Sequence, residues 1–257
     1  MKKICFAISA IVMSSHVMAQ DNTYIRNGNI YSNLGQYFVG AGVATGSKFF
    51  KGQDDQTGVY FNGGYHGEDF NADLSGINYR FLGDNDSAIN FSVFIVANPG
   101  FDADSADVLK GMKDRDFSGD LGLNADFHVG EGTLSAKFQH DVTSVYNGYQ
   151  ADITYYHPMD LGFASLVPYA GAQYFSKEFV NYYTGVSSLE ATSARPAYQS
   201  NGALALKVGY ALVIPITENL DLTQSTAYTH LGANMADSPI VASDNQWLTT
   251  FGVSYSF

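Results

Sequence analysis

Histidines beside acidic residues are the part of this sequence whose side chains could do catalytic chemistry. His140 is followed directly by Asp141, and His157 lies further along. In a hydrolase, a histidine takes a proton from a serine or a water molecule while a carboxylate orients its ring. No serine in a recognisable nucleophile motif accompanies these histidines. We therefore interpret them as ordinary residues near strand ends.

Two short acidic stretches could in principle bind metal ions. His66, Glu68 and Asp69 lie together, but zinc sites need a spaced histidine and cysteine framework that the sequence lacks. Asp102-Ala103-Asp104 could attract calcium, but it has no twelve-residue loop pattern around it. We predict neither a metal site nor a cofactor.

The first residues have the pattern of an export signal. Met1-Lys2-Lys3 is a basic start, residues 4–12 form an apolar run, and Val17-Met18-Ala19 precedes Gln20 with the small residues of a cleavage site. This pattern predicts a signal peptide over residues 1–19. Cys5, the single cysteine, would be removed with it, so the mature fold would depend on no disulfide.

The charge of the chain excludes several classes of partner. Without Lys2 and Lys3, 11 basic and 25 acidic side chains remain, a formal charge of −14. Nucleic acids and anionic lipid surfaces both require a basic protein surface, so neither is an expected partner. Beyond the signal region, no apolar stretch reaches the roughly 20 residues that a transmembrane helix needs.

The final segment alternates strictly between two kinds of side chain. Trp247, Phe251, Val253, Tyr255 and Phe257 share one parity, while the other parity is mainly small or polar. This is the period of a β-strand. Similar alternation recurs along the chain and predicts an all-β, transmembrane, antiparallel up-and-down barrel with apolar side chains facing lipid. The polar residues expected to face the interior are Asp120, Asn124, Asp126 and Lys207.

We expect about 12 strands, with 10–14 open as alternatives. Residues 20–36 would be an N-terminal periplasmic lead-in, and residues 37–257 the barrel. A parity slip at Ser75-Gly76 suggests a β-bulge within one long strand. The expected strands are 37–45, 57–66, 69–82, 87–97, 116–130, 132–144, 148–157, 162–176, 179–185, 202–215, 218–231 and 246–257.

Counting strands assigns the connections to the two sides of the membrane. Loops 46–56, 186–201 and 232–245 would be extracellular. Segment 98–115 would then be periplasmic and is too long for a turn, so we expect a folded insert there. Asp104 or Ser105 could cap a short helix in it. The insert is a candidate partner segment, with Leu109, Gly111, Met112 and Arg115 as its candidate contact residues.

Three stretches of the sequence resemble the MipA/OmpV (MltA-interacting protein) family. They are NYYTGVSSLEATSARPAY from Asn181, YTHLGANMADSPIV from Tyr228 and LKGMKDR from Leu109, and the Tyr-x-Phe ending matches too. The motif residues carried over are Tyr182, Gly185, Glu190, Arg195, Tyr198, Asp237, Ser238 and Pro239, with Tyr255 and Phe257 as the signal for the outer-membrane assembly machinery. By themselves, Asp237-Ser238-Pro239 predict a turn, and Arg195 could pair with Glu190, with interior aspartates or with a ligand.

The resemblance implies a non-enzymatic barrel in the Gram-negative outer membrane, in contact with lipid and lipopolysaccharide. It also implies a scaffold role that links a lytic transglycosylase and a penicillin-binding protein in peptidoglycan turnover, although fold-level transfer of function is an analogy. The main alternative is a small diffusion channel or solute-specific pore, suggested by Asp120, Asp126 and Lys207. An enzyme at the barrel rim and adhesion through the outer loops also remain open.

Overall fold

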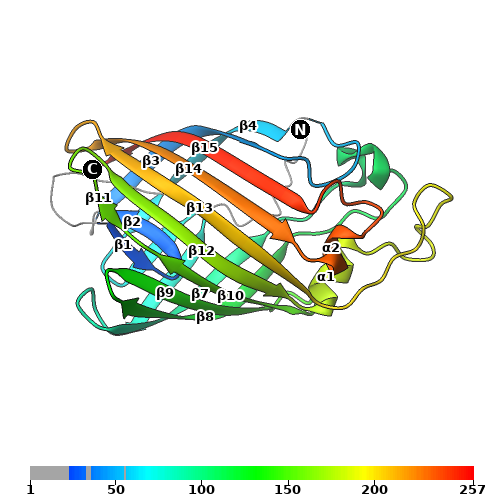
Figure 1. The fold of residues 1–257 in the computed structure, drawn as a ribbon, viewed down its shortest axis with the longest axis horizontal. Helices are drawn as coiled ribbons and strands as arrows, with labels where there is room; N and C mark the ends of the chain where they lie inside the picture. The colour runs from blue at the N-terminus through cyan, green and yellow to red at the C-terminus, as the bar shows by residue number, and fades with distance from the viewer. Residues whose placement is uncertain (1–22, 33–35, 55) are drawn as a thin grey trace.

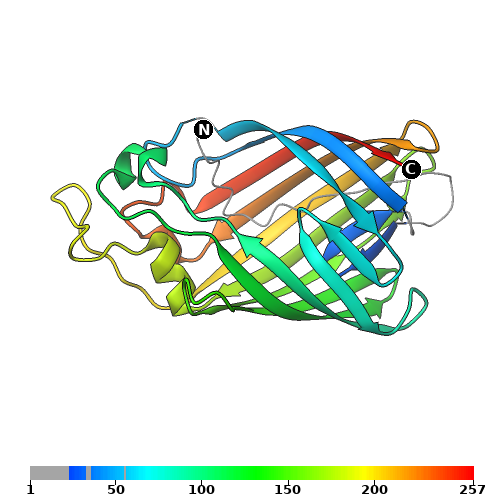
Figure 2. The same ribbon diagram turned by 180° about the vertical axis from the view of Figure 1, so that it is seen from behind.

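The computed structural model describes residues 23–32, 36–54 and 56–257, and its main feature is a β-barrel (Figures 1 and 2). The expected signal peptide lies outside the described residues. Among those residues, no helix is long and apolar enough to cross a membrane. The twelve wall strands are β3 (Gln36–Gly46), β4 (Gln56–His66), β5 (Phe70–Asp73), β6 (Gly76–Leu82), β7 (Ile89–Asn98), β8 (Ser118–Val129), β9 (Gly132–Asp141), β10 (Tyr149–Tyr156), β12 (Ser165–Phe175), β13 (Ala203–Pro215), β14 (Leu220–Leu231) and β15 (Asn245–Ser256).

The wall closes by antiparallel pairing in chain order. Each strand pairs with the next, β15 pairs with β3, and β10 pairs with both β9 and β12. The two-residue strand β11 (Met159–Asp160) pairs only with β12 at one rim. The predicted fold, a closed antiparallel barrel of twelve strands, is therefore confirmed.

The alternation in β15 separates the two faces of the wall. Phe251, Val253 and Tyr255 are about half exposed on the outside, whereas Gln246 and Ser256 are buried inside. A water-soluble sheet would do the reverse and bury its apolar face. An apolar outer face with a polar inner face is the arrangement of a barrel surrounded by lipid.

Two of the expected strands are wrong. The stretch 69–82 is not one bulged strand but the hairpin β5–β6, because Asp73 accepts the Ser75 N–H at 2.6 Å and Gly76 takes a φ of +118°. An aspartate bonded two residues ahead, followed by a glycine, reverses the chain. The stretch 179–185 lies in helix α1 (Lys177–Thr184), whose N-cap Ser176 accepts the Phe179 N–H.

The first of these errors changes where segment 98–115 lies. Because β5–β6 adds a strand before it, the segment lies at the same barrel end as connections 47–54, 142–148, 176–202 and 232–244, which we call the loop end. The expected placement opposite the long loops is therefore wrong. The other end, the turn end, carries Phe257 and connections 67–69, 83–88, 130–131, 157–164 and 216–219. In place of the expected helix, the segment has two 3-10 turns, Ala103–Ser105 and Asp107–Leu109, and neither has a side-chain cap.

A small hairpin occupies the barrel interior near the turn end (Figure 1). It consists of β1 (Thr23–Arg26) and β2 (Asn29–Ser32), joined by Asn27 and Gly28, which both have positive φ. Ile25 and Ile30 pack on a small apolar patch of the inner wall formed by Tyr156, Val167, Tyr169 and Ala211. The described part of the expected lead-in therefore lies inside the barrel rather than ahead of it.

Candidate functional site

The loop-end connections fold into one layer over the barrel mouth, which we call the loop layer. It comprises segments 47–54, 98–117, 142–148, 176–202 and 232–244, including α1 and α2 (Ala233–Ala236). Its apolar core continues onto the inner wall at this end of the barrel. The buried core residues are Phe49, Phe50, Phe101, Ala106, Leu109, Met112, Tyr146, Phe175, Phe179, Val180, Tyr183, Val186, Ala203, Ala205, Leu231, Met235, Ile240 and Val241.

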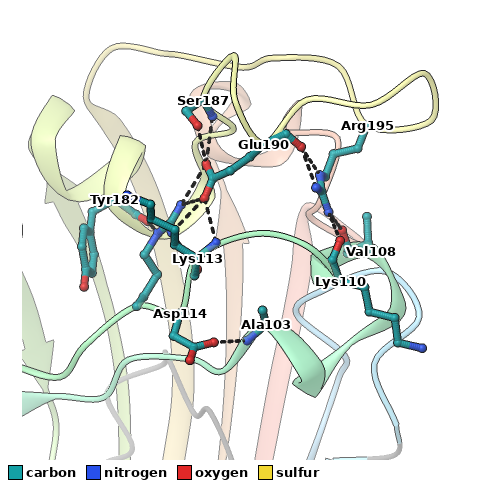
Figure 3. Close-up of polar contacts among 10 residues, drawn as sticks. Ala103, Val108, Lys110, Lys113, Asp114, Tyr182, Ser187, Glu190 and Arg195 are labelled. Atoms are coloured by element: carbon teal, nitrogen blue, oxygen red, sulfur yellow. Dashed lines mark hydrogen bonds and ion pairs between the residues drawn. The ribbon is translucent and has the colours of Figure 1, made fainter.

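Glu190 is the polar centre of the loop layer (Figure 3). Its carboxylate accepts from Nη1 of Arg115 at 3.1 Å, from the Lys113 N–H at 3.1 Å and from the Ser187 hydroxyl at 2.8 Å. Burial alone would raise the pKa of this carboxyl, but the hydrogen bonds outweigh it and lower the pKa from 4.5 to about 2. Glu190 is therefore charged at any physiological pH and holds segment 98–117 against loop 186–201.

Arg195 joins the same two segments through backbone carbonyls. Its Nε and Nη2 donate to the carbonyl oxygen of Glu190 at 3.1 and 2.6 Å, and Nη1 donates to those of Val108 and Lys110. Arg195 is buried, and Figure 3 shows its guanidinium between Glu190 and the carbonyls of Val108 and Lys110. Of the alternatives that the sequence left open for Arg195, the ion pair with the Glu190 carboxylate does not form. Arg115 takes that role instead.

The remaining motif residues connect α1, loop 186–201 and the α2 region. The buried Ser238 hydroxyl donates to the carbonyl of Thr184 at 2.6 Å, next to Asp237 and Pro239. Tyr198 donates to the carbonyl of Asn234 at 3.2 Å and bridges to Val186 through the backbone. Tyr182 donates to the carbonyl of Asp116 at 3.2 Å, and Gly185 ends α1 by donating to Asn181.

The expected partner residues of segment 98–115 are mostly buried. Leu109 and Met112 lie in the apolar core of the loop layer, and the guanidinium of Arg115 stacks near Phe101 and Tyr182. Gly111 is exposed and has a φ of +83°. Three motifs that are distant in the sequence thus meet in one layer, where their visible role is to hold that layer together.

The four residues expected to face the interior all lie on the inner wall. Asp120 accepts from Gln139 and Gln150 at 2.8 and 3.2 Å and also from Tyr146. Asn124 accepts from Ser135, Asp126 accepts the Asn27 N–H of the hairpin, and Lys207 pairs with Asp152 at 2.5 Å. The interior wall is therefore polar, and these four side chains each bond to other groups inside the barrel.

The interior hairpin is attached to the wall by polar contacts that sequence reasoning missed. Buried Arg26 donates to the carbonyl of Gly67 and to Asn85, while Tyr156 donates to the carbonyl of Gly28 at 2.8 Å. The signal for this hairpin was present, because Asn27-Gly28 is the residue pair that favours a tight hairpin turn and it stands between short alternating segments.

The histidines considered for chemistry do not assemble catalytic groups. The Nδ1 atom of His140 contacts the backbone oxygen of Asp141, whose carboxylate instead binds the N–H groups of Thr143, Tyr146 and Asn147. His66 pairs with Asp73, whereas Glu68 and Asp69 lie beside Arg80. Within residues 23–32, 36–54 and 56–257, no group of three or more metal-binding side chains gathers.

Comparison with known proteins places this geometry in a family. Residues 39–257, which include almost the whole barrel and the loop layer, match the family described as "MltA-interacting protein MipA". The chain belongs to the MipA family. The resemblance inferred from the three sequence motifs is therefore confirmed.

Curated relatives of this MipA-family chain are outer-membrane proteins by name. Outer membrane protein OmpV of Vibrio cholerae serotype O1 is 46% identical over the full length of both chains, and Omp26La of Vibrio anguillarum is 44% identical over the same span. Among solved structures, an outer membrane channel from Pseudomonas putida F1 aligns with a TM-score of 0.43 and 9% identity over 94% of this chain and 100% of that one. The chain is an outer-membrane β-barrel protein, as predicted.

Proposed function

We propose that this barrel acts as a scaffold, binding partner proteins that synthesise or remodel peptidoglycan, and that it has no catalytic centre of its own. The observation that carries this proposal is the apolar core of the loop layer at one barrel end, together with the β1–β2 hairpin that lies inside the barrel near the other end. Both features occupy space that a wide channel would need, which favours a role for the outer surfaces of the barrel. The family description, which refers to interaction with MltA, supports this proposal.

The partner surface is the turn end. Outer-membrane barrels have short turns on the periplasmic side and longer loops outside. The turn end therefore faces the periplasm, where peptidoglycan enzymes work, and segment 98–115 faces the exterior. The connection 157–164 presents exposed apolar side chains at the turn end, including Leu161 and Phe163.

Co-purification with a lytic transglycosylase of the MltA type tests this proposal. The double variant Leu161→Ser/Phe163→Ser should lose most of the bound enzyme. The matched variant Leu189→Ser, which changes a 93% exposed leucine in the loop layer, should retain it. Loss of binding only in Leu189→Ser, or in neither variant, would contradict a partner surface at the turn end.

A small pore is the second candidate. The observation in its favour is the partly accessible ion pair between Lys207 and Asp152 inside the barrel, with side chains 20% and 11% exposed. Such a pair suits a hydrated interior rather than a dry core. Planar-bilayer recordings of the intact protein separate the two candidates, since a steady cation-selective current supports a pore and silence supports the closed scaffold.

A further inference from the structure

The β1–β2 hairpin crosses the barrel interior without joining the wall. It forms a separate two-stranded sheet and pairs with no described wall strand. On one side, Nδ2 of Asn78 in β6 donates to the Tyr31 hydroxyl at 2.9 Å. On the other side, Ile25 and Ile30 share a buried apolar cluster with Ala211 of β13. Strands β6 and β13 are six steps apart in either direction around the wall, so the hairpin reaches from one side of the barrel to the opposite side (Figure 1).

A band of the inner wall at mid-height is accessible to water. It consists of one partly exposed, inward-facing residue from each of β10, β12, β13, β14 and β15, and we call it the inner band. Its members are Asp152, Gln173, Lys207, Thr229 and Thr250. Each of these strands is paired on both sides, so the exposed surface of the inner band faces the barrel interior.

The inner band lies between two buried zones, as strand β13 shows. Ala205, on the loop-end side of Lys207, belongs to the core of the loop layer. The Lys207 side chain itself is 20% exposed. Ala211, on the turn-end side, is fully buried in the cluster that includes Ile25 and Ile30 of the hairpin. The hairpin therefore lies between the inner band and the turn end.

Asn85 fastens the hairpin to the turn end. Its Oδ1 atom accepts from Nη2 of Arg26 in β1 at 2.8 Å and from Nη1 of Arg80 in β6 at 2.9 Å. Asn85 is an exposed residue of connection 83–88, so water can replace it as the partner of Arg26. Displacing the hairpin breaks such polar contacts but no hydrogen bond of the wall ladder. Two paired strands of four residues also have little stability of their own.

We propose that the β1–β2 hairpin is a displaceable lid, held by Asn85, that controls the access of small hydrophilic molecules from the turn end to the inner band. A segment held through exchangeable polar contacts opens at a lower free-energy cost than the paired strands around it, which is the property that a lid requires. The lid differs from an open pore, because reaching the inner band requires no passage through the loop layer. This role goes beyond the scaffold function and does not depend on it.

A single cysteine in the inner band tests the lid in the purified protein in detergent. Cys5 lies in the expected signal peptide, so Thr229→Cys is the unique thiol of the processed chain. A small water-soluble thiol reagent, trimethylammonium-ethyl methanethiosulfonate, should label it at least about a hundredfold more slowly than Leu189→Cys, an exposed reference in the loop layer. Deleting residues 23–32 should raise the Thr229→Cys rate at least about twentyfold and leave the Leu189→Cys rate unchanged.

Two point variants of connection 83–88 test whether Asn85 holds the lid. Asn85→Ala removes the acceptor of Arg26 and should speed the labelling of Thr229→Cys at least about threefold. Asp86→Ala is the matched control, because Asp86 bonds within its own turn through its backbone N–H, and it should leave the rate unchanged. Equal rates in the two variants would overturn the role of Asn85.

A reversible disulfide tests whether the hairpin must move. A Cβ atom at Gly28 would lie 3.3 Å from Oγ of Ser135 in β9, so Gly28→Cys and Ser135→Cys are placed to form a disulfide. With this pair oxidised, the peptide that carries Thr229→Cys should be labelled at least about tenfold more slowly than after reduction and removal of the reductant. Equal rates in the oxidised and reduced forms would overturn the lid, as would fast labelling with the native hairpin in place. If the deletion variant loses its heat-modifiability, and so does not fold, this comparison decides.

Discussion

The carboxylate of Glu190 lies 3.1 Å from Nη1 of Arg115, although 75 residues separate the two in the chain. Their side chains are 8% and 11% exposed. This pair connects two loop-end segments that share no strand, so it is central to the stability of the loop layer. Removing one partner of a buried pair leaves the other charge desolvated, which costs more than the pair itself contributes.

Glu190→Gln should therefore loosen the loop layer while the barrel stays intact. We expect a loss of about 3 kcal/mol in the local stability of this layer, because the guanidinium of Arg115 keeps its burial and loses its counter-charge. Hydrogen exchange of segments 98–117 and 186–201 measures this. The control Glu178→Gln changes an exposed glutamate in α1 and should have little effect. Equal protection in both variants would contradict a central role for Glu190.

The same carboxylate predicts an acid sensitivity of the loop layer. The pKa of Glu190 is depressed from 4.5 to about 2 in the folded protein, so its contribution is fully present above pH 4.5 and is lost as the pH falls towards 2. Pepsin, which is active in this range, should cleave the loop layer increasingly as the pH drops through it. In Glu190→Gln this pH dependence should be weaker, and an unchanged profile would argue against the assignment.

Arg195→Lys should weaken the loop layer despite keeping the charge. One ammonium group cannot serve the carbonyls of Glu190, Val108 and Lys110 together, so we expect a loss of about 2 kcal/mol. The control Lys110→Met removes an exposed ion pair with Asp107 and should have little effect on stability. Resistance of the loop layer to protease in increasing urea compares the two variants.

The packing of the interior hairpin against the inner wall can be tested with two glycines that have the same φ. Gly28 and Gly130 both have a φ of +62°, but a side chain at Gly28 would meet Lys137 at 3.0 Å, whereas nothing lies within 4 Å of Gly130. Gly28→Val and Gly130→Val should share a backbone strain of about 1 kcal/mol. Only Gly28→Val should release residues 23–32 to fast hydrogen exchange. Release in both variants would mean that backbone strain alone, and not the contact with the inner wall, determines the stability of the hairpin.

The C-terminal aromatic residue should matter for assembly rather than for packing. Phe257 is 66% exposed and contacts Tyr255 by ring stacking, so little of the folded structure depends on it. Phe257→Ser should reduce severalfold the amount of heat-modifiable barrel in outer-membrane fractions. Phe163→Ser, which changes a 68% exposed aromatic residue at the same end, is the matched control and should leave that amount unchanged. If both variants reduced the amount of heat-modifiable barrel equally, assembly would not depend on Phe257 in particular.

The sequence alone determined the class of fold, the compartment and the family. A period of two places every other side chain on the same face, so the apolar and polar parities of residues 246–257 were sufficient to indicate a lipid-facing barrel. The same alternation assigned Asp120, Asn124, Asp126 and Lys207 to the inner face. The Asn27-Gly28 pair favours a tight turn, but the sequence analysis did not predict this hairpin, and its place inside the barrel was not readable.

Only the tertiary structure decided which distant residues meet. The sequence predicted a strand where helix α1 lies, because its Tyr and Val residues have a high β-propensity. The helix is instead favoured by the packing of its buried side chains in the loop layer. The β5–β6 hairpin adds one strand before segment 98–115. The segment therefore lies at the opposite end of the barrel from the one that the sequence predicted. The pairing of Arg115 with Glu190 and the position of the hairpin inside the barrel depend on contacts between segments that are far apart in the chain. No local spacing encodes these contacts, because their partners are brought together only when the barrel closes.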